Sequence, residues 1–301
     1  MIELSVVIPT YNKKEILKKA LRALNNQSCG SDKFEVIMID DGSNDGTEKE
    51  IKNLIPKLKF KTSIFFQKHQ GPAAARNKGI KKAQGKIVLI TNDDTIATPD
   101  LLARHLEFHR RNGENFALLG FVTWHPSLTV TPFMYWLEHG GPYFSFDKIK
   151  GKEAGWERLW TCNISFKKKF LLENGLFDEE FPSAAWEDVE LGYRLGQVGL
   201  KLVYNKKAVG YHYHPTTITS IKDKMKNNGH SVLILKKKIP NRYLPPLGRY
   251  PSFFVFFDKI IFNPFFLFLL EKVCLFFEDK LNLGVFYDLL LLHYRIKGLK
   301  K

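Results

Sequence analysis

Short, continuous apolar runs alternate with amphipathic segments through the first hundred residues of the chain. The apolar runs predict buried strands at residues 4–8, 34–39, 63–66 and 87–90. The intervening segments repeat apolar residues every three or four positions, which is typical of helices packed against a sheet. Strand and helix alternate four times with short connections, so we expect a parallel sheet with helices on both faces.

The pattern after residue 100 is less regular. The expected elements are a helix at 101–111, a strand at 116–122, helices at 167–174 and 186–195, a strand at 198–204 and an extended segment at 208–214. Residues 123–155 are aromatic and irregular, and the shape of a ligand pocket would depend on them. These elements together predict one α/β domain over residues 1–218.

Polar residues follow the predicted strands at the points where they end. The clusters are Thr10-Tyr11, Asp40-Asp41, Arg76-Asn77 and Asn92-Asp93-Asp94. The carboxyl ends of parallel strands meet at one edge of a sheet, which is where ligands bind in open α/β folds. An aromatic ring, several carboxylates and an arginine at this edge could hold a base, a ribose and a metal-bound diphosphate. The first strand is not followed by GxGxxG and no P-loop occurs, which disfavours a dinucleotide site.

Two acidic clusters each allow two interpretations. Adjacent carboxylates such as those in Asn92-Asp93-Asp94 repel unless a cation or hydrogen-bond donors offset them, and Mg²⁺ or Mn²⁺ with phosphates suits such oxygens. Asn-Asp-Asp is equally good turn chemistry. In Trp186-Glu187-Asp188 the acids open a predicted helix, where they could simply complement the helix dipole.

Composition and charge narrow the class of protein. The 301 residues are 44% hydrophobic, which is ample for a large core, and the net charge of +15 favours an anionic partner such as a nucleotide, a lipid headgroup or nucleic acid. Cys29, Cys162 and Cys274 lie far apart, which argues against a zinc site or a disulfide framework. The N-terminus lacks the basic region and long apolar run of a signal peptide, so we expect a cytoplasmic protein.

Residues 219–301 differ in composition from the rest of the chain. They contain 15 Lys and Arg and 6 Asp and Glu, which gives 15 − 6 = +9 of the total charge, together with many phenylalanines. Charges interrupt the apolar runs, and none reaches the roughly 18–20 residues needed to cross a bilayer. We expect amphipathic helices, with residues 253–290 lying in the interface of an anionic membrane. The alternative is a helical subdomain or a contact between copies of the chain that buries the same phenylalanines.

Six short motifs, in their order along the chain, resemble those of family 2 glycosyltransferases. They are Ile8-Pro-Thr-Tyr-Asn12, Ile39-Asp-Asp-Gly-Ser43, Ala75-Arg-Asn77, Asn92-Asp-Asp94, Gly175-Leu-Phe-Asp178 and Trp186-Glu-Asp188. The resemblance covers roughly the first 215 residues. It implies a GT-A fold with a nucleotide-sugar half at about residues 1–100 and an acceptor half at about 101–218, followed by a helical C-terminal extension.

The resemblance also implies roles for individual residues. The nucleotide-sugar would be bound by Pro9, Thr10, Tyr11, Asp40, Asp41, Arg76, Asn92 and Asp93. A divalent cation, Mn²⁺ or Mg²⁺, would be bound by Asp94 and His212. The catalytic base would be Asp188, with Glu187 as the competing carboxylate. The acceptor would contact Trp160, Asn163 and Trp186, since tryptophans can stack on sugar rings, although such tryptophans are as often core residues.

These roles imply an inverting transfer from a nucleoside-diphosphate sugar to the hydroxyl of a glycan or lipid-linked acceptor, as in polysaccharide or cell-envelope biosynthesis. The cation would offset charge on the leaving diphosphate, and Asp188 would accept the proton of the attacking hydroxyl. The chain departs from the family's DxD motif at its first position, which is Asn92. Asn can still bind a ribose hydroxyl or a metal-bound water, so we expect activity with a less acidic metal site.

Two other functions are each suggested by one feature of the sequence. A non-catalytic nucleotide-sugar-binding or scaffold protein is suggested by Asn92, and addition of Mn²⁺ to a donor-hydrolysis or transfer assay would separate the two. A nucleic-acid-binding protein is suggested by the basic charge, but it predicts a basic stripe without a carboxylate cluster. We therefore expect no nucleic-acid partner, and we place the protein on the inner face of the cell membrane as a peripheral protein.

Overall fold

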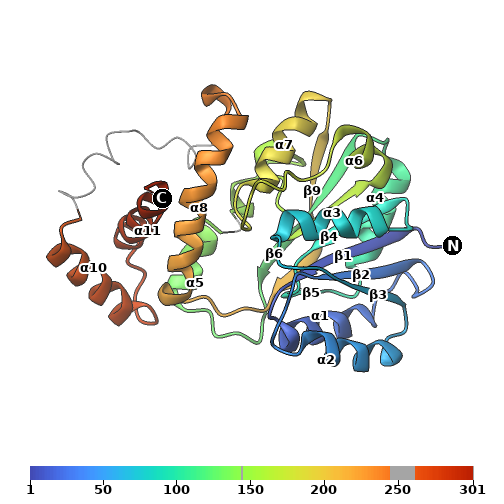
Figure 1. Cartoon of the computed structure of the whole chain (residues 1–301), viewed down its shortest axis with the longest axis horizontal. Helices are drawn as coiled ribbons and strands as arrows, with labels where there is room; N and C mark the ends of the chain where they lie inside the picture. The colour runs from blue at the N-terminus through green and yellow to red at the C-terminus, as the bar shows by residue number, and fades with distance from the viewer. Residues whose placement is uncertain (144, 245–261, 301) are drawn as a thin grey trace. The chain divides into compact units, whose positions relative to one another are not determined.

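The computed structural model describes residues 1–143, 145–244 and 262–300, and its chain divides into two compact units (Figure 1). Unit 1 comprises residues 1–126, 149–182 and 187–214, and unit 2 comprises residues 127–148, 183–186 and 215–301. The sequence places a boundary near residue 218. The contacts within the chain add residues 127–148 and 183–186 to the C-terminal unit.

Unit 1 is built on a mixed sheet with nine strands among the described residues, in the order β3-β2-β1-β4-β8-β6-β9-β5, with β7 paired to β9. The first four strands are β1 (Leu4–Thr10), β2 (Phe34–Asp40), β3 (Lys61–Phe66) and β4 (Ile87–Thr91). They run parallel to one another, which confirms the parallel sheet predicted from the four apolar runs.

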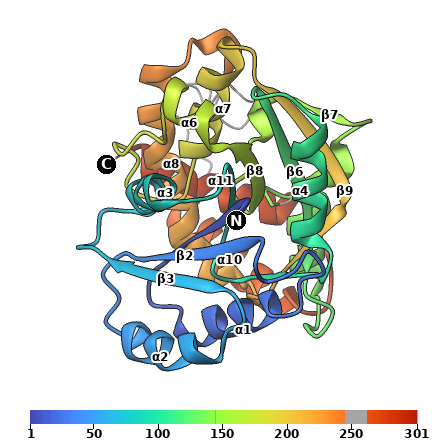
Figure 2. The same ribbon diagram turned by 90° about the vertical axis from the view of Figure 1, so that its right-hand side faces the viewer.

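Helices cover both faces of this sheet, as the alternating pattern predicts (Figures 1 and 2). The helices of this half are α1 (Lys14–Leu24), α2 (Thr47–Leu54), α3 (Pro72–Lys82) and α4 (Leu101–Arg111), with a short 3₁₀ turn η1 (Ile55–Lys57). On one face Val6 and Leu17 of α1 belong to the same buried apolar cluster. On the other face Val7 approaches Gly79 of α3 so closely that a Cβ there would overlap its side chain.

The second half of unit 1 extends the sheet. Its elements are β5 (Thr95–Ala97), β6 (Phe116–Trp124), β7 (Glu153–Ala154), β8 (Asn163–Lys167), β9 (Lys201–His212), α6 (Lys168–Asn174), α7 (Glu187–Gln197) and the 3₁₀ turn η3 (Trp156–Arg158). Strand β8 was not predicted, because its five residues precede a helix directly. It lies antiparallel between β4 and β6.

Strand β9 also differs from the prediction, which separated a strand at 198–204 from an extended segment at 208–214. The chain is one strand from Lys201 to His212, because it pairs with β6 on both sides of a register shift at Gly120/Phe121. The same strand pairs antiparallel with β5, which sets His212 opposite Thr95. This pairing places His212, which is far from β4 in the sequence, beside the residues that follow β4.

A buried polar network fixes β8 to α4. The amide nitrogen of Asn163 donates to the carbonyls of Phe121 and Ala208, at 3.2 and 3.0 Å, so its oxygen must accept from Nε2 of His105 at 2.9 Å. Nδ1 of His105 then accepts from Ser165 at 2.7 Å. Burial lowers the pKa of His105 to about 4, so the imidazole is neutral near pH 7 and can play both roles.

Unit 2 is helical among its described residues. It contains α5 (Pro132–His139), α8 (Ile218–Lys238), α10 (Pro264–Phe277), α11 (Val285–Leu299) and the 3₁₀ turns η2 (Phe146–Lys148) and η4 (Asn241–Tyr243). Helices α8 and α11 pack closely because Gly229 and Gly298 have no side chain to separate their backbones. The predicted helical extension is therefore confirmed for the described part, while Phe253–Phe257 lies outside it.

Two further features of unit 2 bear on the sequence predictions. Residues 123–155, which were expected to be irregular, include α5, whose Phe133 ring lies 4.9 Å from that of Tyr287 in α11. This apolar contact gives the aromatic residues of α5 a packing role. Within the described parts of the chain, no helix is both long enough and apolar enough to cross a bilayer.

We predict that Asn163→Leu lowers the free energy of unfolding by about 3 kcal/mol or more, because it removes the acceptor of the buried His105 N–H and the hydrogen bonds to the carbonyls of Phe121 and Ala208. Urea denaturation measures this loss. The matched control is Asn115→Leu, which removes one hydrogen bond, to the carbonyl of Gly199, at the surface. It should cost less than about 1 kcal/mol. Equal losses in both variants would contradict the importance of the network.

Candidate active site

The loop that follows β3 is folded around the carboxylate of Asp41. Its Oδ1 accepts from Nε2 of Gln67 at 2.7 Å and from the backbone N–H of Gln70 at 3.0 Å, and its Oδ2 accepts from the N–H of Gly71 at 2.9 Å. Nδ1 of His69 also lies 2.8 Å from Oδ2. The Asp41 carboxylate therefore shapes this loop.

The imidazole of His69 in turn supports an exposed aromatic ring at the end of β1. The ring of Tyr11 stacks on it with centroids 4.3 Å apart, and Tyr11 is 43% exposed. The neighbouring carboxylate of Asp40 is buried and accepts from the N–H of Ser43 at 2.8 Å. Tyr11 thus offers a ring at the sheet edge, whereas Asp40 and Asp41 hold the adjoining loops in place.

Asp93 and Asp94, which follow β4, are held in different electrostatic states. The hydroxyl of Thr10 donates to Oδ2 of Asp93 at 2.8 Å, and this contact joins the ends of β1 and β4. Burial, followed by the neighbouring charge of Asp94, raises the pKa of Asp93 to about 7. Asn92, which precedes them, is partly exposed at the same edge.

Asp94 is buried and faces His212, whose Nε2 lies 3.3 Å from its Oδ2. Burial opposes ionisation of Asp94, but the charge and hydrogen bond of His212 and the charge of Lys13 outweigh it and hold its pKa well below the usual range. The other oxygen, Oδ1, is buried without a hydrogen-bond partner among the described residues. An ionised, unpartnered oxygen of this kind could accept a ligand.

A second pair of acids begins α7. The guanidinium of Arg76, on α3, lies 2.6 Å from Oε1 of Glu187, and both side chains are almost completely buried. Asp188 is partly exposed and accepts from the N–H of Val189 at 2.8 Å. Burial of its carboxyl, followed by the charge of Glu187, raises the pKa of Asp188 to about 7 against the opposing charge of Arg76.

Cys162 lies within electrostatic range of both acidic groups. Burial and then the charges of Asp188 and Asp94 raise the pKa of its thiol to about 12, so both carboxylates act on the same neutral side chain. The hydroxyl of Thr91 donates to the carbonyl of Cys162 at 3.0 Å, which fixes this residue beside the end of β4. The predicted metal ligand Asp94 and the predicted base Asp188 therefore lie within electrostatic range of the same side chain in unit 1.

Sequence reasoning missed three contributors to the site. Lys13, two residues after Tyr11, acts on both Asp93 and Asp94, and its Nζ lies 3.4 Å from Nδ1 of His214. No sequence pattern indicated a role for Cys162, because the three cysteines lie far apart in the chain. Asn77 belongs to the Ala75-Arg-Asn77 motif, but the motif did not indicate what its side chain contacts.

The role of Asn77 becomes clear from its contacts. Its amide donates to the carbonyl of Phe177 at 2.8 Å and accepts from the N–H of the same residue at 3.0 Å. It donates as well to Glu179 at 2.8 Å. Asn77 therefore ties α3 to the loop that carries the Gly175-Leu-Phe-Asp178 motif.

The residues predicted to contact an acceptor have varied surroundings. Trp160 is half-buried in unit 1. Asn163 is completely buried, and its amide is used within the network around His105. Trp186 belongs to unit 2, where it is buried and its Nε1 donates to the carbonyl of Asn228 at 3.2 Å. Its backbone is left-handed, with φ of 73°, which is unusual for a large side chain directly before Glu187.

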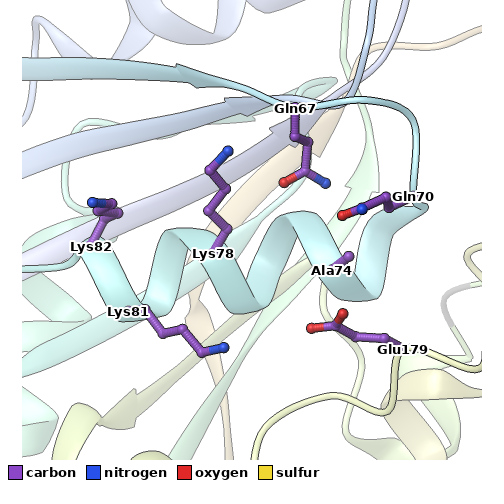
Figure 3. Close-up of a pocket in the computed structure, with 7 residues that line it drawn as sticks. All are labelled: Gln67, Gln70, Ala74, Lys78, Lys81, Lys82 and Glu179. Atoms are coloured by element: carbon purple, nitrogen blue, oxygen red, sulfur yellow. The ribbon is translucent and has the colours of Figure 1, made fainter.

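A separate cavity of about 430 Å³ opens beside α3 (Figure 3). Its lining residues are Gln67, Gln70, Ala74, Lys78, Lys81, Lys82 and Glu179. It adjoins the Asp41 loop through its glutamines but includes neither Asp94 nor Asp188. Because neither acid lines it, this cavity is not the centre of the carboxylate chemistry. The ammonium of Lys78 in its wall donates to the carbonyl of Phe66 at 2.7 Å.

The donor set at the end of β4 fits a divalent cation that is shared with a substrate. The described residues contain no group of three or more His, Cys, Asp and Glu arranged to hold a metal ion alone. The carboxylate of Asp94, with its unpartnered Oδ1, and the imidazole of His212 could supply two ligands. Mg²⁺ and Mn²⁺ commonly combine one or two protein ligands with substrate phosphates.

The chain is similar in sequence to proteins described as glycosyltransferases and polysaccharide synthases. The chain is 30% identical over 268 residues to the uncharacterized glycosyltransferase YfnE of Bacillus subtilis and 29% identical over 270 residues to the chondroitin synthase of Escherichia coli. The alignments cover 73% and 80% of this chain, but only 67% and 39% of those relatives. This chain therefore matches only part of each relative.

Solved structures share the fold. S. aureus TarS 1-349 in complex with UDP superposes with a TM-score of 0.60 at 20% identity, over 99% of this chain and 89% of that one. The mannosyltransferase PcManGT of Pyrobaculum calidifontis, in complex with GDP-Man and Mn²⁺, gives 0.61 at 17% identity, over 99% and 86%. The GT-A fold expected from the sequence motifs is confirmed.

The resemblance to a transferase family rested on six motifs, and a match over a continuous region now supports it. Residues 5–175 match the family described as Glycosyl transferase family 2, and they make up more than half of the chain. The match includes the Asp41 loop, Arg76 and the Asn92-Asp93-Asp94 cluster. The chain belongs to glycosyl transferase family 2.

Proposed function

We propose that unit 1 transfers a glycosyl group from a nucleoside-diphosphate sugar to an acceptor hydroxyl, with inversion at the anomeric carbon. The proposal is supported by two unlike carboxylates that both lie within electrostatic range of Cys162: Asp94, which faces His212 and is held ionised, and Asp188, whose pKa is raised to about 7. A metal ligand must keep its charge, whereas a general base must gain and lose a proton near the working pH.

The donor would bind along the ends of β1, β2 and β4. The exposed ring of Tyr11 can contact the base, and Asp40, Asp41 and Pro9 define the loops around it. UDP and GDP-Man, bound by TarS and by PcManGT, are donors or donor products of this chemical class. The family motif assigns Arg76 to the same nucleotide, but its ion pair with Glu187 suggests that it acts by ordering α7.

Asp94 and His212 would hold the divalent cation, with Asn92 and Asp93 beside them. When bound, the cation supplies positive charge to the diphosphate as it leaves. Lys13 supports the same function from the protein itself, because its ammonium group already acts on both carboxylates and lies next to His214. A cationic side chain at this point favours an anionic leaving group.

Asp188 is the general base in this proposal. As the acceptor oxygen bonds to the anomeric carbon and the bond to the diphosphate breaks, the hydroxyl proton passes to the Asp188 carboxylate. Glu187 is less suited, because it is buried and paired with Arg76, while Asp188 is partly exposed. A single displacement with one base inverts the configuration of the sugar.

The acceptor would be a glycan or a lipid-linked glycan, in polysaccharide or cell-envelope biosynthesis. The support is the similarity to a chondroitin synthase and the basic, phenylalanine-rich tail, which favours work at the inner face of a membrane. Of the predicted acceptor residues, Trp160 keeps a partly exposed surface in unit 1. A non-catalytic sugar-nucleotide-binding protein is the alternative, and it would bind the donor without hydrolysing or transferring it.

We predict that Asp94→Asn abolishes transfer and leaves the fold intact. The amide keeps the shape of the side chain but cannot supply the negative charge that binds Mn²⁺ or Mg²⁺. Isothermal titration with UDP and with GDP should show binding that depends on Mn²⁺ in the wild type and is independent of it in the variant. Full activity of the variant, or of the wild type in EDTA, would refute the metal assignment.

We predict that Asp188→Asn lowers kcat by roughly 10²–10⁴-fold, the usual contribution of a general base. Donor affinity should change little, because the donor is bound by other residues. Glu187→Gln is the neighbouring control and should retain more activity than Asp188→Asn. A dead Glu187→Gln enzyme beside an active Asp188→Asn enzyme would show that the base is Glu187.

The raised pKa of Asp188 also predicts a pH profile. The carboxylate must be ionised to accept a proton, so kcat/KM should rise as the pH rises through about 7 and then level off. At one unit below that pKa, the rate should be roughly tenfold below the plateau. The residual activity of Asp188→Asn should lack this rise, and a wild-type profile that is flat from pH 5 to 8 would contradict the assignment.

A further inference from the structure

One face of α10 is apolar and exposed. Phe265, Phe268, Leu269 and Phe276 lie at helical spacing along it, and they are 76%, 60%, 51% and 60% exposed. Lys272 occupies the same stripe and is exposed as well. We call these five residues the α10 face. A surface helix normally turns polar residues outward, so an apolar stripe in this position indicates a binding surface.

The opposite side of α10 accounts for its packing within unit 2. Leu270 and Cys274 are buried there. Glu271 pairs with Lys222 of α8 and accepts from the hydroxyl of Tyr294 at 3.0 Å. The helix is therefore attached by one side, and the α10 face is not required for that attachment.

Acidic and basic side chains near the α10 face differ in their partners and exposure. Two of the three acids in and just after α10 face the other helices of unit 2, since Glu271 is paired with Lys222 and Glu278 accepts from the N–H of Ile218 at 3.3 Å. Lys272 stays outward, with its Nζ 5.6 Å from the centre of the Phe268 ring. Lys280 likewise lies 3.6 Å above the ring of Phe276, beside the exposed acid Asp279.

The apolar surface continues beyond the helix in the sequence. Leu281, which precedes α11, and Val285 and Phe286, which begin it, are 53%, 69% and 48% exposed. Phenylalanines with lysines placed over their rings suit a bilayer interface, where rings enter the headgroup region and ammonium groups meet phosphates. A two-fold contact between copies that was centred on this stripe would instead bring Lys272 near its own counterpart and oppose like charges.

We propose that the α10 face binds the surface of an anionic lipid bilayer by inserting Phe265, Phe268, Leu269 and Phe276 among the headgroups. Lys272 and Lys280 contact the lipid phosphates at the edge of the inserted rings. This inference names the surface behind the proposed membrane location, and it does not depend on the transfer chemistry.

The test is co-sedimentation of the full chain with vesicles that mix phosphatidylglycerol and phosphatidylcholine, and with vesicles of phosphatidylcholine alone. The protein should bind the anionic vesicles more tightly, and added salt should weaken this binding. Lys272→Glu should weaken it by at least about fivefold, since it removes one cation near the surface and adds an acid.

A matched pair of leucines separates insertion from general hydrophobicity. Leu269→Ser on the α10 face should weaken binding by about tenfold. Leu172→Ser, on α6 of unit 1, makes the same change at a leucine that is 49% exposed, and it should leave binding unchanged. Far-ultraviolet circular dichroism and thermal unfolding of both variants check that each remains folded.

Several outcomes would overturn the proposal. Equal effects of Leu269→Ser and Leu172→Ser, or equal binding to both kinds of vesicle, would show that the α10 face does not recognise an anionic bilayer. Concentration-dependent dimers in light scattering, dissolved by Leu269→Ser and accompanied by no vesicle binding, would assign the face to a second copy. Donor hydrolysis in solution, which Leu269→Ser should leave unchanged, reports on the proposed transfer chemistry separately.

Discussion

Repulsion among carboxylates at one edge of the sheet is the constraint on which the rest of unit 1 depends. Asp93, Asp94, Glu187 and Asp188 come from two elements far apart in the sequence, and their charges would oppose folding if none were offset. Each is offset in a different way. Asp94 faces His212, Glu187 is paired with Arg76, and Asp93 is bonded by Thr10. Asp188 accepts a hydrogen bond from the backbone N–H of Val189, and burial together with the charge of Glu187 raises its pKa, so it holds its proton more strongly.

This distribution of charge explains how neighbouring acids can perform different tasks. A carboxylate with a cationic neighbour stays ionised and suits a metal ion, whereas one surrounded by buried groups and another acid exchanges its proton near neutral pH. Asp94 and Asp188 represent these two cases. The difference comes from their surroundings, because the two side chains are chemically identical.

The scaffold holds these surroundings fixed through contacts that take no part in the chemistry. Strand β8 enters the sheet antiparallel, and the neutral imidazole of His105 ties it to α4. Cys162, which directly precedes this strand, is therefore held where the charges of both Asp94 and Asp188 act on its thiol. Asn77 performs a similar task on α3, where it fixes the loop that leads toward α7. Buried polar groups with complete hydrogen bonding give this kind of rigidity.

The sequence by itself determined the first four strands, their helices and the positions of the acidic clusters, because these depend on local periodicity and on strand ends. It could not determine that β8 lies between β4 and β6, since a five-residue strand before a helix has no distinctive pattern. It also could not show that the adjacent acids Glu187 and Asp188 have different surroundings. Only the tertiary structure buries one beside Arg76 and leaves the other partly exposed, because an ion pair across 111 residues depends on how α3 and α7 meet.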